Sequence, residues 1–236
     1  MQRKVEELSR VKEIAFMGKV TASLSHEIKN TLAIINESAG LMGDLLRKDG
    51  PEDWPAYSRL TNLLASIEEQ VQRSADIVKR LNQFAHSMDK SLADLDLNET
   101  VRQTAILAQR FATLRRVNLE TQLASNPLYL QSDPFRLLYV IFGFIERAIN
   151  GSPRESEVSV QTEQSGEMFQ VMVTDQGTVE VDSIRALISA SPEAEAERDD
   201  SDLTVLVQTM KALGGTVAFE RRDEGLSKIT LSFPAK

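Results

Sequence analysis

Apolar residues recur every three or four positions through the first third of the chain, which is the spacing of an amphipathic α-helix. The pattern predicts one helix from residue 1 to about residue 48 and a second helix from about Trp54 to His86. Asp49-Gly50-Pro51 lies between them and is a helix stop signal. The seam expected to be buried on the first helix consists of Met17, Val20, Leu24, Ile28, Leu32, Ile35, Ala39, Met42 and Leu45.

Two long helices joined by a short turn form an αα-hairpin, and each of these helices carries one long apolar stripe. The stripe of the second helix is Leu60, Leu63, Leu64, Ile67, Val71, Ala75, Ile77, Val78, Leu81 and Phe84. Such a hairpin has only half of a core, so we expect two copies of the chain to pair into a four-helix bundle. Packing of the hairpin on its own C-terminal region is the alternative.

From about Leu92 the period changes, and alternating stretches appear between helical ones. Helices are expected near 99–116, 134–150, 181–189 and up to 213, and strands near 117–123, 128–130, 157–164, 168–174, 216–220 and 228–233. The helix that begins at Ser132-Asp133-Pro134 is apolar nearly all round and should be buried. The predicted fold class is α+β, with a helical hairpin domain over residues 1–90 and an α/β sandwich domain over residues 91–236.

The first helix carries one polar group of chemical interest. Each residue turns a helix by about 100°, so His26 and Asn30 lie about 160° from the centre of the apolar seam and should face water. Ser23 and Ala33 flank this side and are small. Glu27 could hold the Nδ1–H of His26 and leave Nε2 as a nucleophile, although a surface histidine without a role is the alternative. A zinc site of the H-E-x-x-H type is excluded, because Asn30 stands where the second histidine is needed.

The stretch Ser25-His26-Glu27-Ile28-Lys29-Asn30-Thr31-Leu32 resembles the H box of two-component sensor histidine kinases, S-H-E-[IL]-x-[NT]-P-L. The resemblance implies that His26 is the phosphoacceptor and that Glu27 orients and activates it. It also implies that Asn30 serves in phosphotransfer and in dephosphorylation of the partner regulator. Thr31 stands where the family has the proline that bends its first helix.

The second half of the chain resembles the ATP-binding domain of the same family. Asp133-Pro134-Phe135-Arg136-Leu137 resembles the lead-in D-P-x-R-L, and Leu213-Gly214-Gly215-Thr216-Val217 resembles the closing H-G-G-x-[IV]. The resemblance covers essentially the whole chain. It implies a dimerisation and histidine-phosphotransfer hairpin followed by an ATPase-like domain.

Three motifs that serve ATP in this family are altered. The family's N-L-L-x-N-A is Gly143-Phe144-Ile145-Glu146-Arg147-Ala148 here, and an arginine has no acceptor for Mg²⁺. The adenine motif D-x-G-x-G is Asp175-Gln176-Gly177-Thr178-Val179, which lacks one glycine. The loop G-x-G-L-G-L falls on Arg198-Asp199-Asp200-Ser201-Asp202-Leu203 and has lost every glycine.

The replaced loop would normally receive phosphates at a helix N-terminus. Six acidic residues now stand in it or just before it: Glu193, Glu195, Glu197, Asp199, Asp200 and Asp202. Carboxylates there satisfy the same backbone donors and the same end of the helix dipole, and they repel a nucleotide. We therefore do not expect ATP or Mg²⁺ to be bound, and the ATPase-like domain is interpreted as degenerate.

Charge and composition limit the classes of partner and the cellular compartment that are expected. The 236 residues carry a net charge of −8, which disfavours nucleic acid or an anionic membrane as a partner. The absence of cysteine excludes disulfides and thiolate metal sites and suits a reducing cytoplasm. No apolar run reaches the roughly 18 residues of a membrane span and no signal peptide is visible, so a cytoplasmic location is expected.

Three functions stay open at this point. In the first, His26 accepts a phosphoryl group and exchanges it with the aspartate of a response-regulator receiver domain, without ATP. In the second, the chain is an ATP-dependent sensor histidine kinase that phosphorylates His26 itself. In the third, it is a dimeric scaffold or a regulator phosphatase without kinase chemistry. The intact H box together with the altered nucleotide motifs favours the first.

Overall fold

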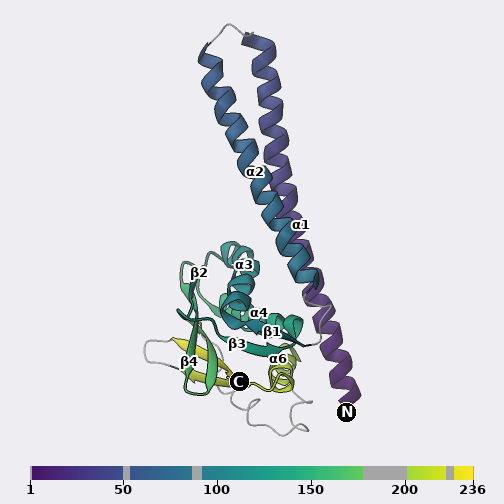
Figure 1. Cartoon of the computed structure of the whole chain (residues 1–236), viewed down its shortest axis with the longest axis vertical. Coiled ribbons are helices and arrows are strands. Elements are labelled where there is room, and N and C mark those ends of the chain that lie inside the picture. The colour runs from purple at the N-terminus through teal and green to yellow at the C-terminus, as the bar shows by residue number, and fades with distance from the viewer. Residues whose placement is uncertain (1, 50–53, 87–91, 178–200, 222–225, 236) are drawn as a thin grey trace. The chain divides into compact units, whose positions relative to one another are not determined.

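The computed structural model describes residues 2–49, 54–86, 92–177, 201–221 and 226–235 (Figure 1). Contacts divide the chain into two compact units. One is Met17–His86, and the other combines Met1–Phe16 with Ser87–Lys236. The first turns of the long N-terminal helix therefore belong by contact with the C-terminal half of the chain, which the sequence pattern did not indicate.

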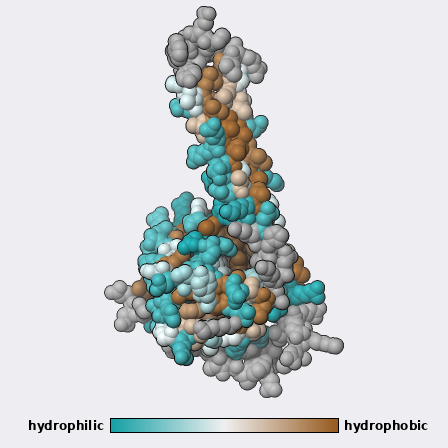
Figure 2. All heavy atoms as spheres, in the orientation of Figure 1, coloured by the Kyte–Doolittle hydropathy of each residue, from teal (hydrophilic) through white to brown (hydrophobic). Residues whose placement is uncertain are grey.

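The first unit is the helical hairpin. Helix α1 spans Gln2–Asp49 and helix α2 spans Trp54–His86, which confirms the two long helices that the periodicity predicts. Several large apolar side chains of the hairpin are exposed, among them Leu32, Leu41, Leu64, Val71 and Val78. Figure 2 shows hydrophobic side chains along the visible surface of the hairpin. Each helix thus has an apolar face that its hairpin neighbour does not cover.

The buried side of α1 differs in part from the predicted seam. Val20 and Leu24 are buried as expected, but Leu32 is 53% exposed and Ala39 is exposed. Three small hydroxyl side chains are buried instead: Ser23, Thr31 and Ser38. A hydroxyl can bond to the backbone of its own helix, so its burial costs little, and a count of apolar residues does not register such positions.

The second unit contains a five-stranded mixed sheet in the order β2-β4-β5-β7-β6. Its strands are β2 Asn118–Gln122, β4 Glu157–Ser165, β5 Met168–Asp175, β6 Thr216–Arg221 and β7 Ser227–Pro234. β2 pairs with β4 in parallel, and the other pairs are antiparallel. Buried and partly exposed residues alternate along β4 and β7, so one face of the sheet is packed.

Helices α3 Leu97–Arg115, α4 Pro134–Gly151 and α6 Ser201–Ala212 pack with this sheet. Helix α4 begins as predicted, because the Asp133 carboxylate accepts from the amide of Arg136 at 3.0 Å and Pro134 occupies the first turn. Its apolar residues are buried, which makes α4 the central element of the core. The α+β fold class is confirmed.

A two-stranded antiparallel sheet was predicted only in part, because the strand near 128–130 was expected and its partner was not. It pairs β1 Ala93–Asp96 with β3 Tyr129–Ser132. Strand β1 was not predicted, because its four residues, although they alternate in polarity, are too few to establish a period. The expected helix at 181–189 and most of the acidic stretch at 191–202 lie outside the described residues. Among the helices that are described, none is long and apolar enough to cross a bilayer.

Candidate functional site

His26 lies on the exposed side of α1, as the helical geometry predicts. The exposed residues that share its side of the helix include Ala22, Lys29, Asn30 and Ala33. Ser23, which was expected to flank the imidazole at the surface, is buried and does not belong to this face. Alanines on either side of His26 leave the ring open to a second molecule.

The structure brings His26 and Asn30 together. The amide nitrogen Nδ2 of Asn30 lies 3.2 Å from Nδ1 of His26, one helical turn away. Glu27 is half-buried, and no hydrogen bond joins it to His26 in the described part of the hairpin. The polar neighbour that holds the ring in this structure is therefore Asn30, while a role for Glu27 as the activating acid stays a prediction.

Strand β5 ends at Asp175, which stands where the resembled family has the aspartate of its adenine motif. Asp175 is 0% exposed, and its Oδ1 accepts from the Gly177 amide and from Ser227 Oγ, each at 2.6 Å. Its other oxygen, Oδ2, is buried and has no hydrogen-bond partner among the described residues. Burial raises the pKa of this carboxyl, and the hydrogen bonds from Ser227 and Gly177 oppose the rise. A buried acceptor without a donor suits the amine edge of a base.

The tight turn after Asp175 depends on a glycine. A Cβ at Gly177 would lie 2.8 Å from Asp175 Oδ1 and 2.8 Å from the backbone oxygen of Gly151. Only glycine therefore fits between the carboxylate and the end of α4. This part of the family motif is retained in sequence and in shape, whereas Thr178 and Val179 lie outside the described residues.

The two positions at which the resembled family has asparagines near Mg²⁺ carry Gly143 and Arg147 in this chain. A Cβ at Gly143, where the family has the first Asn of its motif, would overlap the side chain of Leu206 on α6. Arg147, where the family has the Mg²⁺-binding Asn, offers only donors. Within the described ranges, no group of three or more His, Asp or Glu side chains comes together as a metal site. The residues described here fit a base but do not fit Mg²⁺.

The start of α6 replaces the phosphate loop of the family. Arg198, Asp199 and Asp200 lie outside the described residues, as do Glu193, Glu195 and Glu197. Asp202 is in the first turn of α6 and forms an ion pair with Lys12 of α1. The carboxylate is largely exposed, so this pair contributes little to stability. Its effect is to place a negative charge at the helix end where the family binds phosphate.

An aromatic cluster joins the first turns of α1 to α4. The ring of Phe16 lies 5.9, 5.4 and 4.9 Å from the rings of Phe135, Tyr139 and Phe142, measured between centroids. Burial raises the pKa of the Tyr139 hydroxyl, and the nearby carboxylates of Asp202 and Glu13 raise it further. The cluster therefore lies in a negative local field. Sequence periodicity missed this contact because Phe16 is outside the regular seam of α1.

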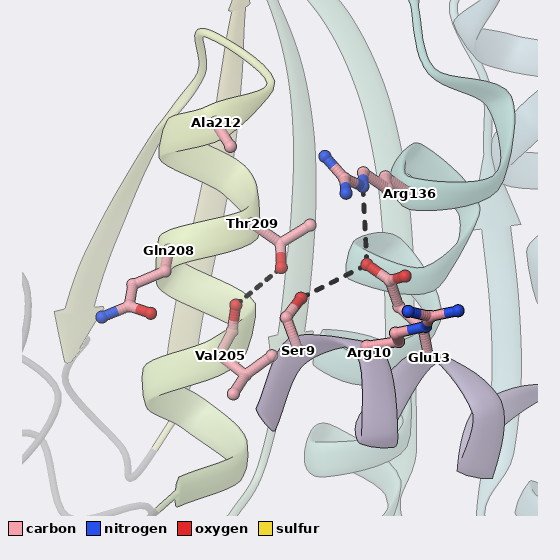
Figure 3. A pocket seen from close by; sticks show the side chains of 8 residues that line it. All are labelled: Ser9, Arg10, Glu13, Arg136, Val205, Gln208, Thr209 and Ala212. Carbon is pink, nitrogen blue, oxygen red and sulfur yellow. Dashed lines mark hydrogen bonds and ion pairs between the residues drawn. The ribbon is translucent and has the colours of Figure 1, made fainter. Parts of the chain in front are cut away.

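A pocket of about 540 Å³ lies beside this cluster (Figure 3). It is lined by Ser9, Arg10, Glu13, Arg136, Val205, Gln208, Thr209 and Ala212. The carboxylate of Glu13 lies 3.4 Å from Arg136 Nε and accepts a 3.3 Å hydrogen bond from Ser9 Oγ. The charges of Glu13 and Arg136 in the pocket thus neutralise each other. None of the predicted site residues lines the pocket.

Several sensor proteins are similar to this chain in sequence. No protein-family model matches the chain. Sensor histidine kinase ZraS of Escherichia coli strain K12 is 24% identical over 230 residues, which is 97% of this chain and 48% of ZraS. C4-dicarboxylate transport sensor protein DctS of Rhodobacter capsulatus is 23% identical over 234 residues, which is 97% of this chain and 35% of DctS.

Solved structures agree with the fold. The catalytic domain of histidine kinase ThkA matches with a TM-score of 0.52 at 16% identity, over 62% of this chain and 97% of that chain. Histidine kinase ThkA in complex with response regulator protein TrrA matches with a TM-score of 0.52 at 17% identity, over 100% of this chain and 66% of that chain. The chain is similar in sequence and in fold to sensor histidine kinases. The chain spans about half the length of ZraS.

Proposed function

We propose that the chain is a phosphotransfer protein in which His26 takes a phosphoryl group from the aspartate of a receiver domain and passes it to another. The observation that carries the proposal is the exposed His26 ring with Nδ1 held by Asn30. Arg147, which stands where the family has the Mg²⁺-binding asparagine and offers no acceptor, supports it. Glu27 is proposed as the acid that assists the ring.

Asn30 controls which ring nitrogen can react. With its Nδ2–H directed at Nδ1, the neutral imidazole carries its proton on Nε2. A half-turn of the amide presents Oδ1, which accepts from Nδ1–H and leaves the lone pair on Nε2 free. That second tautomer is the nucleophile, since Nε2 is the nitrogen that Asn30 does not cover.

The proposed step exchanges one bond for another. Nε2 attacks the phosphorus of the receiver's aspartyl phosphate, an N–P bond forms, and the O–P bond to the aspartate breaks and releases its carboxylate. Oδ1 of Asn30 stabilises the positive charge that develops on the ring. Such a transfer needs mainly positioning and charge stabilisation, and the receiver brings its own Mg²⁺. The reverse step returns the group to a second receiver.

The partner is proposed to be a response-regulator receiver domain. One structural neighbour, histidine kinase ThkA, was solved in complex with response regulator protein TrrA. On this chain the face around His26 is exposed and flanked by Ala22 and Ala33. Small side chains let a receiver bring its phosphoaspartate within bonding distance of the ring.

We also propose that the hairpin works as a homodimer. Leu64, Val71 and Val78 of α2 repeat every seven residues and are 48%, 53% and 44% exposed. A seven-residue repeat of exposed apolar residues is the pattern by which long helices pair. Leu32 of α1 adds a further exposed apolar side chain. A second copy of the chain would cover these residues in a four-helix bundle.

The second candidate is an ATP-dependent kinase that phosphorylates His26. The unpartnered Oδ2 of Asp175 and the glycine turn after it favour this function, because they suit a purine base. Arg147, the close contact of Gly143 with Leu206, and Asp202 at the start of α6 oppose it. Among the described residues no metal site accompanies Asp175, and a base contact alone does not activate a triphosphate, so the first candidate is preferred.

Transfer from a labelled receiver tests the proposal. Receiver domains from the source organism are phosphorylated with ³²P and mixed one by one with the chain and with its His26→Gln variant. Label is expected on the wild-type chain and on His86→Gln, and none on His26→Gln. A chain that takes no label from any phosphorylated receiver contradicts phosphotransfer and leaves the kinase or a scaffold.

A further inference from the structure

A pair of hydroxyl groups, one buried and one partly exposed, joins the two helices of the hairpin. Oγ1 of Thr31 lies 2.7 Å from Oγ of Ser74, although the two residues are 43 positions apart in sequence. Thr31 is only 2% exposed. Its hydroxyl also lies 2.9 Å from the backbone oxygen of Ile28, and that of Ser74 lies 2.8 Å from the backbone oxygen of Gln70. Both residues belong to the same compact unit.

The hydroxyls of Thr31 and Ser74 have fewer hydrogens to donate than they have possible hydrogen bonds. Two hydroxyls supply two hydrogens, whereas the geometry offers three contacts. Two oxygens at 2.7 Å require a hydrogen between them, so one hydroxyl must donate to the other. Either Ser74 donates to Thr31 and Thr31 to Ile28, or Thr31 donates to Ser74 and Ser74 to Gln70. In each arrangement the two helices are joined, and one backbone carbonyl goes without its hydroxyl.

This link lies directly beside the candidate site. Thr31 follows Asn30, the residue that holds His26, and it stands where the family has a bending proline. A hydroxyl that donates to a carbonyl one turn back bends a helix slightly, as a milder substitute for proline. Unlike a proline, the Thr31 hydroxyl also forms a hydrogen bond to the neighbouring helix. This bond fixes the axial register of α1 relative to α2.

We infer that Thr31 and Ser74 are positioning residues that hold α1 in the register at which Asn30 meets His26. The expected effect on the transfer rate rests on the proposed function. The expected effect on the NMR signals of His26 depends only on the structure of the hairpin. Neither residue touches the phosphoryl group. Their effect passes through the backbone of residues 28–31 to the Asn30 amide.

Four variants test the inference. Thr31→Val keeps the shape and removes the hydroxyl, and Ser74→Ala removes the other hydroxyl; in each, the remaining hydroxyl can still donate to its own helix. The exchange Thr31→Ser with Ser74→Thr restores a hydroxyl pair. Ser38→Ala is the matched control, because Ser38 is a buried serine of α1 two turns beyond Thr31.

Two measurements are made on each variant as the full chain. In single-turnover transfer from a phosphorylated receiver, Thr31→Val and Ser74→Ala should each lower the maximal rate roughly tenfold, since positioning errors act on the rate of the chemical step. The half-saturating receiver concentration should stay unchanged. The exchange should return the rate to that of the wild type, and Ser38→Ala should leave it unaltered.

The second measurement does not need phosphotransfer. The chain has two histidines, so imidazole NMR signals assign directly with His26→Gln. Thr31→Val and Ser74→Ala should shift the His26 signals and leave those of His86 in place, while Ser38→Ala should shift neither. Unmoved His26 signals, or an equal effect of Ser38→Ala, overturn the inference. If the wild type takes no label but its His26 signals respond as stated, the proposed function fails and the positioning role stands.

Discussion

The side-chain nitrogen of Asn30 lies 3.2 Å from Nδ1 of His26 on the exposed side of α1. Their spacing of four residues brings them one above the other on the helix, so the contact follows from helical geometry. The amide can donate to Nδ1 or, after a half-turn, accept from it. The same pair of residues can therefore hold the imidazole in either neutral tautomer, and the tautomer with its proton on Nδ1 leaves the lone pair of Nε2 free.

Replacement of Asn30 by alanine should slow transfer without unfolding the hairpin. Loss of a hydrogen bond of about 1 kcal/mol lowers the rate roughly five- to tenfold. The rate is measured by single-turnover transfer from a labelled receiver. Glu163→Ala, an exposed residue of β4 outside the hairpin, is the control and should stay within about twofold of the wild type. Equal rates for Asn30→Ala and the wild type would remove Asn30 from the site.

A charge placed on the exposed apolar repeat should separate the proposed dimer. Val71→Glu puts a carboxylate into the face that a second copy is expected to cover. Light scattering with size-exclusion chromatography should give the mass of a monomer for this variant and of a dimer for the wild type. Asn62→Glu, about 180° round α2 from Val71, is the control and should remain dimeric. A monomeric wild type refutes the four-helix bundle.

Restoring the family's asparagine at Gly143 should destabilise the C-terminal unit. A side chain at this position overlaps Leu206, and such overpacking costs about 1–3 kcal/mol. The free energy of unfolding is measured in urea. Leu206→Ala in the same chain should recover part of the loss, because the two positions share one space. Gly18→Asn, on a helix with nothing within 4 Å of the added atom, should not lower stability.

The buried carboxyl of Asp175 should make stability fall as pH rises. Because burial raises its pKa in the folded chain above the ordinary 3.8, the folded state binds the proton more tightly than the unfolded state. Its contribution is therefore fully present below pH 3.8 and is lost as pH rises through the folded value. Asp175→Asn cannot ionise, so its melting temperature relative to the wild type should increase with pH across this window. A constant difference would mean that Oδ2 is solvated or partnered.

Elements with a strong period were predictable, and contacts between them were not. The bounds of α1 and α2 follow from apolar spacing and from Gly50-Pro51, and α4 follows from Asp133-Pro134. Strand β1 did not, because it is short, of mixed polarity and exists only by pairing with β3.

In the candidate site, too, the local features were predictable from the sequence and the contacts between helices were not. Exposure of His26 and its contact with Asn30 are local and follow from the helical turn. The hydroxyl pair of Thr31 and Ser74 depends on the register between two helices, which no local pattern encodes. The burial of Ser23 likewise depends on which side of α1 packs against α2. The spacing of apolar residues predicted a different side, with Ser23 next to the exposed face.

The central claim is that a receiver domain, and not ATP, supplies the phosphoryl group of His26. The direct measurement offers the wild-type chain two donors in parallel, γ-³²P-ATP with Mg²⁺ and a ³²P-phosphorylated receiver, and follows acid-labile label on the chain with His26→Gln as blank. Label from the receiver alone, at His26, is the predicted result. Label from ATP at His26 would contradict the account and identify the chain as an autokinase.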